Sequence, residues 1–241
     1  STLATSIRSI SLISLEDRTL KLTRKQVERM IARIKSGKMA PLPLNGHIRY
    51  GNTKLADTTA IFNLGAARDC PSRLRGLCQI PDDCYADKPE NQYDTCIPYR
   101  RRQEIIWKTT SADDWAHEFI AIIGRKRNPV DTLRFCESGD LWGIPCFKKM
   151  RKIAGIVLRE TGIVTYTYTA RTDLYERGAF QDRGDLIMNG SAGMMLDNRF
   201  QPVDVVEKGS PVCNGSKKDI CGTVCRMCAQ RGGFTIQIPK H

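Results

Sequence analysis

The chain has 241 residues, 41% of them hydrophobic, which is enough to bury the core of one α/β domain with a small appendage. Its 38 Lys and Arg against 26 Asp and Glu give a formal net charge of +12, which favours a polyanionic partner over a purely structural role. No apolar run approaches the roughly 18 to 20 residues that cross a bilayer, and residues 1–15 lack the features of a secretory signal. We therefore expect a cytoplasmic protein with no membrane partner, and DNA is the leading candidate partner.

A basic helix is predicted between Thr23 and Gly37. Apolar residues recur there with helical spacing, Thr23 fits the N-cap, and Gly37 fits the stop. The opposite face is rich in Lys and Arg, which suits either contact with phosphates or an ordinary solvated surface. Because residues 39–43 have the composition of a linker, we expect residues 1–43 to form an arm outside the main body.

Glu137 and Asp140 flank a Ser-Gly turn and are the first catalytic candidates. The surrounding pattern predicts a strand, a helix and a second strand over residues 132–135, 142–158 and 163–169. Such a βαβ unit presents its chemistry at the carboxyl ends of its strands. The alternative is an ordinary strand-to-helix connection in which Ser138 or Asp140 caps the helix.

Two further predicted strands end in polar side chains. Asp173 follows the strand over 165–169, and Asn189 and Ser191 lie where the segment 185–194 runs into a Gly-rich loop. We expect these groups to share one rim with the Ser-Gly turn. An α/β fold is therefore predicted over residues 44–205, and a TIM-like barrel, complete or partial, fits the rim best.

Two basic segments suggest contacts with the DNA backbone. The first combines three arginines with Tyr99 and Trp107, and the second is the turn before Pro129. The first segment also suits the exposed start of a helix. The predicted DNA-binding residues are Arg100, Arg101, Arg102, Arg125, Lys126 and Arg127.

The last segment, residues 206–241, carries four cysteines that predict a zinc site: Cys213, Cys221, Cys225 and Cys228. His241 is a candidate to replace one of them. A rival interpretation is the Cys-x3-Cys-x2-Cys spacing with which radical S-adenosylmethionine enzymes hold an iron–sulfur cluster. Those enzymes carry the motif in the loop after the first barrel strand, whereas here it lies near the end of the sequence.

A first group of cysteines comprises Cys70, Cys78, Cys84 and Cys96. The gaps between them are wide and uneven, and they lack the paired Cys-x2-Cys signature. The sequence leaves two interpretations open, a second metal site or a loop with free or packed thiols.

Several motifs together resemble a known family. They are Asn52-x-Lys54-Leu55, Phe62-x-Leu64 before Cys70-Pro71, Cys84-Tyr85-Ala86, Glu137-Ser138-Gly139-Asp140, Tyr166-x-Tyr168-Thr169, and the last cysteines with Pro239-Lys240-His241. From Gly51 to His241 the chain resembles bacteriophage DNA 7-deazaguanine transglycosylases, distant relatives of the tRNA-guanine transglycosylases.

The resemblance implies a TIM-barrel-like fold, a zinc site near the carboxyl terminus, and exchange of guanine in DNA for a 7-deazaguanine base such as preQ0 without ATP. Such exchange would protect phage DNA from restriction. The tRNA enzymes place a catalytic carboxylate in an Asp-Ser-Gly-Gly motif, to which Glu137-Ser138-Gly139-Asp140 is similar but not identical. Their zinc ligands, three cysteines and a histidine, have a different spacing.

Base exchange needs a carboxylate at the glycosidic carbon and an acid or base for the purine. We assign Asp140 as nucleophile and Glu137 as acid, base or purine ligand, with Asp173 and Asp185 as substitutes. The predicted substrate-binding residues are Ser138, Gly139, Tyr168, Asn189 and Ser191, and an extruded base is expected to meet Tyr166, Tyr168 or Trp142. The alternatives are a non-enzymatic zinc-knuckle DNA-binding protein and a radical iron–sulfur enzyme.

Overall fold

A computed structural model describes residues 22–191, 193–213, 221, 223 and 225–239. The strands are β1 (Arg49–Tyr50), β2 (Thr59–Phe62), β3 (Thr132–Phe135), β4 (Val164–Thr169), β5 (Leu186–Gly190), β6 (Asn198–Val203) and β7 (Thr235–Pro239). The helices are α1 (Arg24–Lys35), α2 (Pro71–Leu74), α3 (Asp87–Gln92), α4 (Cys96–Thr109), α5 (Ala112–Ile123), α6 (Ile144–Thr161) and α7 (Thr172–Glu176), with short 3-10 turns η2 (Ala67–Asp69) and η3 (Met227–Ala229).

The strands form one 7-stranded sheet in the order of the sequence, β1 to β7. The β1–β2 pair is antiparallel, and every pairing from β2 to β7 is parallel. The mixed α/β class is therefore confirmed, but the closed barrel is wrong. In the described part of the chain β1 and β7 are the two edges of an open sheet, and β1 is too short and runs in the wrong direction to complete a ring of parallel strands.

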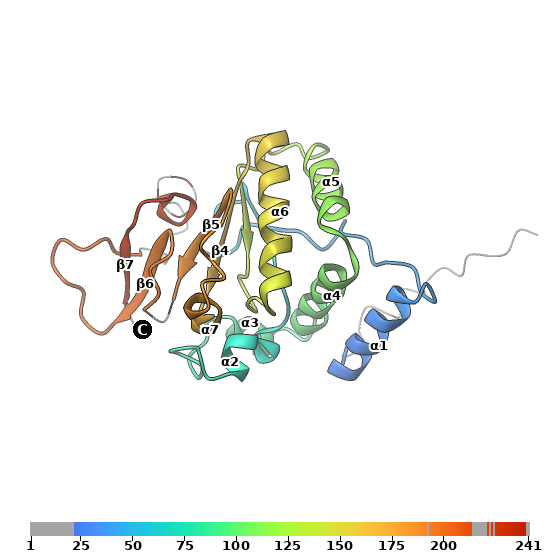
Figure 1. Ribbon diagram of the computed structural model, residues 1–241, viewed down its shortest axis with the longest axis horizontal. Helices are drawn as coiled ribbons and strands as arrows, with labels where there is room; N and C mark the ends of the chain where they lie inside the picture. Colours follow the sequence, from blue (N-terminus) through green and yellow to red (C-terminus); the bar gives the residue numbers. More distant parts are fainter. Residues whose placement is uncertain (1–21, 192, 214–220, 222, 224, 240–241) are drawn as a thin grey trace, which may run out of the picture.

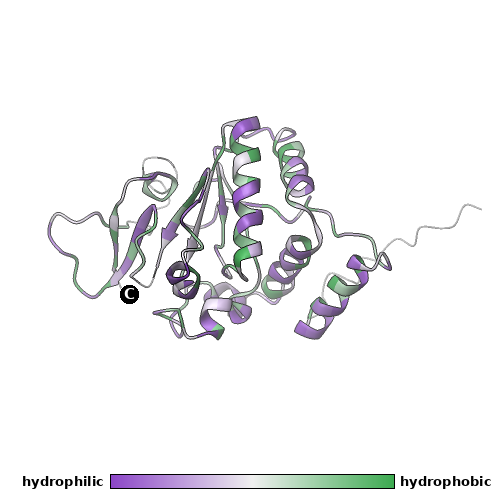
Figure 2. Ribbon diagram, viewed as in Figure 1, coloured by the Kyte–Doolittle hydropathy of each residue, from purple (hydrophilic) through white to green (hydrophobic). Residues whose placement is uncertain are grey.

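The predicted βαβ unit is present as β3–α6–β4. Gly162 ends α6 in the left-handed conformation with a φ of +74°. The apolar stripe of α6, including Phe147, Met150 and Ile153, packs on Leu133 and other inward side chains of the sheet. Figure 1 shows α4, α5 and α6 on one side of the sheet, and Figure 2 shows the hydrophobic stripe of α6 beside its polar outer face.

The other face of the sheet carries different chemistry. Arg134 of β3 is in register with Tyr166 of β4, and Tyr168 is in register with Asn189 of β5. Because successive side chains of a strand alternate between faces, these residues point away from α6. We call this surface, defined by Arg134, Tyr166 and Tyr168, the tyrosine face.

The basic helix α1 begins and ends as predicted. Thr23 and Gln26 form a capping box at its start, and Gly37 has a φ of +72° just past its end. Val27 and Ile34 are buried against Ile105 of α4. The helix therefore packs on the body through a small apolar contact of its own.

The last strand belongs to the same sheet as the others. β7 lies within the segment 206–241 and pairs with β6 along its whole length, from Arg199↔Thr235 to Val203↔Pro239. None of the helices among the described residues is long and apolar enough to cross a membrane.

Candidate functional site

The Ser-Gly turn after β3 is held against the loop that follows β2. The Ser138 backbone N–H donates to Asn63 Oδ1 at 2.7 Å, and its hydroxyl donates to the Gly65 carbonyl at 3.0 Å. Gly139 has a φ of +76°, and a Cβ placed there would lie 3.1 Å from the Gly65 nitrogen. Ser138 and Gly139 therefore join two loops at the carboxyl edge of the sheet.

Asp140 is buried at this edge, with an exposed fraction of 4%. Its carboxylate accepts hydrogen bonds from the Ser72 hydroxyl at 2.5 Å, the Ala170 N–H at 2.8 Å and the Leu141 N–H at 2.7 Å. Burial raises the pKa of Asp140, while these donors act in the opposite direction by favouring the carboxylate. The side chain links the loops after β2, β3 and β4, and the geometry does not favour it as nucleophile because both oxygens already have protein donors.

Glu137 is arranged differently. Oε1 accepts a hydrogen bond from Asn52 Nδ2 at 2.6 Å, and the backbone carbonyl accepts one from the Tyr85 hydroxyl at 2.6 Å. The hydrogen bonds of the described residues leave Oε2 without a donor. Burial raises the pKa of nearby Tyr99 to about 12, and the charge of Glu137 adds to that shift. Asn52 therefore holds Glu137 in one orientation, and Oε2 is the oxygen that a ligand could approach.

Asn52 is positioned by its own turn. Its Oδ1 accepts the backbone N–H groups of Lys54 and Leu55, each at 2.7 Å, which leaves Nδ2 directed at Glu137. The Asn-x-Lys-Leu motif after β1 therefore forms a turn that holds the Asn52 side chain in place.

The tyrosine face adjoins Glu137. The Arg134 guanidinium stacks over the Tyr168 ring at 4.9 Å and donates to the Tyr85 hydroxyl at 3.0 Å. Tyr168 meets Tyr166 and Phe200 edge to face, at 6.2 and 4.9 Å between ring centroids. Arg134 Nε is buried without a hydrogen-bond partner among the described residues. An arginine stacked on a tyrosine suits contact with a planar ligand that carries acceptor atoms.

The other predicted carboxylates do not join this site. Asp173 forms a two-bond pair with Arg171, both bonds 2.7 Å, and this contact lowers the pKa of Asp173. Arg171 is buried and also donates to the Leu141 carbonyl. Asp185 is exposed and lines a groove beside α6, on the helical side of the sheet. Both residues are poor substitutes for Glu137.

Asn189 is fully engaged by its neighbours. Its Nδ2 donates to the carbonyls of Thr167 at 3.1 Å and Cys228 at 2.9 Å, and its Oδ1 accepts from Asn198 at 2.9 Å. It therefore fixes the carboxyl-terminal segment on the sheet. Ser191 is half-buried, and its N–H donates to the Thr169 carbonyl at 2.9 Å.

Trp142, the third predicted base-stacking residue, has an internal role. Its ring N–H donates to the Leu64 carbonyl at 3.0 Å, and its face meets Lys108 Nζ at 3.6 Å and the Arg24 guanidinium at 5.3 Å. Arg24 and Lys108 also pair with Glu104, whose side chain is fully buried. The ring helps to join α1 to α4.

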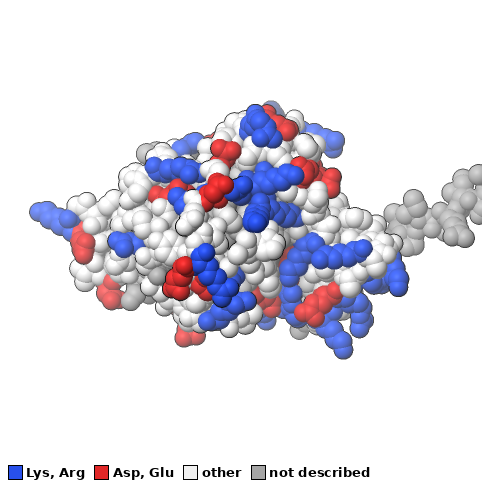
Figure 3. Space-filling view, in the orientation of Figure 1, with Lys and Arg blue, Asp and Glu red and all other residues white. Residues whose placement is uncertain are grey.

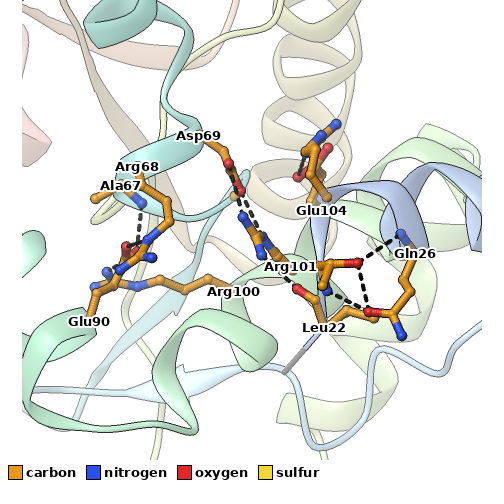
Figure 4. A network of polar contacts seen from close by, with 12 residues as sticks. Leu22, Gln26, Ala67, Arg68, Asp69, Glu90, Arg100, Arg101 and Glu104 are labelled. Atoms are coloured by element: carbon orange, nitrogen blue, oxygen red, sulfur yellow. Dashed lines mark hydrogen bonds and ion pairs between the residues drawn. The ribbon is translucent and has the colours of Figure 1, made fainter. Parts of the chain in front are cut away.

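The arginine patch at the start of α4 is a correction to the DNA-binding prediction. Arg100 is buried, and its Nη1 donates to Glu90 Oε1 at 2.7 Å (Figure 4). The same nitrogen donates to the Ala86 carbonyl at 2.7 Å. Arg101 makes a two-bond pair with Asp69, at 2.8 and 3.1 Å, and donates to the Leu22 carbonyl. Arg102 is half-buried. Arg100 and Arg101 therefore join helices and loops internally.

The second predicted basic segment is on the surface. Arg125 and Arg127 are exposed, and Lys126 is half-buried with its Nζ 3.0 Å from the centre of the Tyr50 ring. This turn precedes β3 and so lies at the amino edge of the sheet, at the opposite end from Glu137. The exposed cations Lys25, Arg29, Arg33, Lys35 and Lys38 gather on and just after α1, where Figure 3 shows dense positive charge.

The four carboxyl-terminal cysteines are free, half-buried thiols. Burial raises the pKa of Cys228 to about 12, with the charges of Cys213 and Cys221 adding to the shift. However, no three His, Cys, Asp or Glu side chains in the described part of the chain are placed to hold a metal ion. Zinc at these cysteines stays a prediction that the geometry does not support, and His241 lies outside the described residues.

The first cysteine group lies at the carboxyl edge of β2. Cys70, Cys78 and Cys84 are free and half-buried. Burial raises the pKa of Cys70 to about 12, with the charges of Asp140 and Cys84 contributing. Burial also raises the pKa of Cys84, and the charge of Cys78 adds to that shift. Burial raises the pKa of Cys96 as well, and the charged groups that act on it are Arg100, Glu90, Glu137 and Arg49.

Sequence reasoning missed Asn52, Tyr85 and Arg134 as parts of the site. The motifs that contain Asn52 and Tyr85 contribute to the family resemblance, but they do not indicate a role for either residue. Arg134 could have been found because a charged residue inside a strand that is covered on both faces requires an explanation.

No curated protein and no solved structure matches the chain. A family model described as Gene product 88 matches residues 44–198, which include β1 to β5, Glu137, the tyrosine face and the first cysteine group. Since the match covers more than half of the 241 residues, the chain belongs to the Gene product 88 family.

Proposed function

We propose that the protein exchanges guanine in DNA for a 7-deazaguanine base of the preQ0 type, with Glu137 as the reacting carboxylate. The observation that carries the proposal is the geometry of Glu137. Asn52 orients one of its oxygens, the other is left without a donor among the described residues, and Arg134 and the tyrosines stand beside it. This assignment replaces Asp140 as nucleophile, because the oxygens of Asp140 are occupied by donors from three loops.

The chemistry requires one carboxylate to act first as the nucleophile and then as the leaving group. Glu137 Oε2 attacks the sugar C1′, the bond from C1′ to the guanine nitrogen breaks, and guanine leaves with the electron pair and takes up a proton from water. The incoming base then gives the proton of its ring nitrogen to water, attacks C1′ and releases the carboxylate, so no proton is gained or lost over the two steps. Neither step needs ATP, because one glycosidic bond replaces another.

Arg134 and the tyrosines suit recognition of the base. Guanine presents two acceptors, O6 and N7, to which an arginine donates well. Tyr85 is 49% exposed and Tyr168 is half-buried, so ring surface is available for stacking with a base that has left the helix. A 7-deazaguanine lacks N7 and keeps O6, so Arg134 would hold both bases through the shared oxygen.

The cations on and after α1 are the best-placed DNA contacts. The groove of about 850 Å³ beside α6 is a weaker candidate, because its cations are offset by Asp113, Asp182 and Asp185. Two of these acids pair directly with lysine or arginine, as Arg151–Asp182 and Lys152–Asp113. In contrast to that groove, α1 contains a single acidic residue, Glu28, to offset its cations.

Mass analysis of nucleosides tests the proposal. Purified chain is incubated with guanine-containing DNA, single-stranded and duplex, and preQ0, and the DNA is then digested to nucleosides. We expect the deazaguanine nucleoside with the unmodified chain, none with Glu137→Gln, and full activity with Glu160→Gln, a matched change at a carboxylate on the far end of α6. Unchanged activity in a folded Glu137→Gln chain would refute the assignment.

A second candidate is a DNA-binding protein without catalysis, which is favoured by the engagement of Asp140 and Asp173 in internal contacts and by the charge of α1. The same assay separates the two. Binding that falls steeply with salt, together with nucleosides of unchanged mass in every reaction, would support the binding protein.

A further inference from the structure

We infer that Cys136 is a positioning residue, whose left-handed backbone turns the Glu137 side chain away from the helical core and toward Asn52 and the tyrosine face. The φ of Cys136 is +59°, and no other residue in the described part of the chain, glycine apart, has a positive φ. A residue with a Cβ adopts this conformation only at a cost in energy, and such residues gather at functional sites. That Glu137 reacts rests on the proposed function, whereas the direction of its side chain does not.

The alternation of side chains along β3 would place these two residues the other way round. Leu133 and Phe135 lie in the core cluster that includes α6, and Arg134 points to the tyrosine face. Continued past the end of the strand, the same alternation puts Cys136 on the tyrosine face and Glu137 in the core. A carboxylate there would be buried among apolar side chains.

The structure shows the opposite placement. Cys136 is 4% exposed and belongs to the core cluster, where its thiol lies beside Thr167 of β4 and Cys146 of α6. Glu137 instead accepts the hydrogen bond from Asn52 Nδ2 at 2.6 Å. The left-handed residue has therefore exchanged the sides of the sheet toward which the two side chains point.

Hydrogen bonds from the end of β2 hold this bend on both sides. The Cys136 N–H donates to the Phe62 carbonyl at 3.1 Å, and the Ser138 N–H donates to Asn63 Oδ1 at 2.7 Å. The residues before and after Glu137 are thus fixed to consecutive residues of the neighbouring segment, so the bend cannot relax without loss of these bonds. Such fixation allows a costly backbone conformation to persist.

The role belongs to the backbone at position 136 and not to the thiol. Burial raises the pKa of the Cys136 thiol well above its ordinary value, so the thiol stays protonated at neutral pH and is a poor nucleophile. Removal of the sulfur should therefore leave base exchange intact, whereas a side chain that opposes a positive φ should impair it.

Three substitutions that differ in backbone preference test the inference in the base-exchange assay. Cys136→Ala removes only the sulfur, and Cys136→Gly accepts a positive φ without strain, so both should keep most of the activity. Cys136→Val is similar in size to cysteine, but its branched Cβ opposes the left-handed conformation. We expect Cys136→Val to lower kcat about 100-fold with KM nearly unchanged, because displacement of a reacting group by about 1 Å has an effect of this size.

Cys146→Val is the matched control. It makes the same change at a second buried cysteine, within α6, where valine meets no positive φ. A folded Cys146→Val chain should keep the kcat of the unmodified protein, which separates the backbone effect from the effect of a repacked core.

A double-mutant cycle provides a readout that does not depend on catalysis. The free energies of unfolding of chains with Glu137→Ala, Asn52→Ala and both changes measure the coupling between these two side chains. We expect the coupling of the unmodified chain to persist in the Cys136→Gly background and to vanish in the Cys136→Val background.

The two readouts separate failure of this inference from failure of the proposed function. If the unmodified chain exchanges no base, the proposed function fails, and the cycle still decides the inference. Equal coupling in the Cys136→Gly and Cys136→Val backgrounds, or an unchanged kcat in folded Cys136→Val, would overturn it. If Cys136→Val does not fold, Cys136→Ala decides, because loss of the Asn52–Glu137 coupling in a folded Cys136→Ala chain would assign the effect to the thiol.

Discussion

Glu137 and Asp140 follow the same strand, yet their carboxylates have different hydrogen-bond partners. Asp140 accepts donors from the loops after β2, β3 and β4, whereas Glu137 meets one side-chain donor and faces Arg134 and the tyrosines. The first carboxylate organises the edge of the sheet, and the second is available for chemistry.

Asp140→Asn should therefore destabilise the fold. The amide replaces an acceptor oxygen with a donor that faces the donors of Ser72, Ala170 or Leu141, and an unmet buried hydrogen bond costs about 1–3 kcal/mol. Chemical denaturation measures the loss, with Asp182→Asn, an exposed carboxylate, as the control. An Asp140→Asn variant as stable as the unmodified protein would contradict this role for Asp140.

Lys149 predicts a pH dependence of stability. Burial lowers its pKa from 10.5 to about 8, although its ammonium donates to the carbonyls of Trp107 and Thr110. Between pH 8 and 10.5 the unfolded chain binds the proton more tightly than the folded chain, so this residue makes unfolding less favourable as pH rises, by at most about 1.4 kcal/mol per pH unit.

The effect is isolated by comparison with Lys149→Met. The neighbouring Cys146, whose pKa burial raises to about 11, opposes the trend but is present in both proteins. The free energy of unfolding of the unmodified chain should rise relative to that of the variant from pH 8 to pH 10.5. A constant difference over this range would show that Lys149 is not desolvated.

At the scale of elements, α1 combines an apolar contact with a cationic surface. Val27 and Ile34 pack on α4, and Arg24 pairs with Glu104, while the remaining cations face solvent (Figure 3). Under the proposed function the outer face contacts DNA, while the inner face attaches the helix to α4.

Replacing Lys25, Arg29 and Arg33 together by glutamine should weaken DNA binding and flatten its salt dependence, because each phosphate contact adds about 0.9 to the slope of log affinity against log salt. The fold should be unaffected, since all three are exposed. Titration at several salt concentrations measures the change, with Arg125→Gln and Arg127→Gln as the comparison at the other basic segment. An unchanged slope in the triple variant would exclude α1 as a DNA contact.

The elements that the sequence predicted well have strong local signals. β3 matches its predicted bounds, and the limits of α6 lie within three residues of those predicted. β6 was missed because its sequence, Asn-Arg-Phe-Gln-Pro-Val, lacks a clear alternation and contains proline.

The site was less predictable because it depends on contacts between distant segments. Nothing near Asp140 in sequence indicates that Ser72 and Ala170 donate to it, and nothing near Arg100 and Arg101 indicates Glu90 and Asp69. Local patterns place Glu137 and Asp140 just after a strand, whereas the long-range contacts decide which of the two carboxylates is engaged by donors.

At the scale of the whole molecule, the open sheet exposes its two faces differently from a closed barrel. Helices cover one face (Figure 1), and the tyrosine face is approached by the Tyr85 loop and by the segment around η3. A closed barrel confines substrate to one end, whereas this sheet offers Glu137 beside a partly exposed aromatic surface.

The most direct test of this account is the release of labelled guanine from DNA when preQ0 is supplied. We predict release by the unmodified protein and by any folded fraction of Asp140→Asn, and none by folded Glu137→Gln. Release by Glu137→Gln at the unmodified rate, or no release by a folded, DNA-bound unmodified protein, would contradict the central claim that Glu137 is the reacting carboxylate.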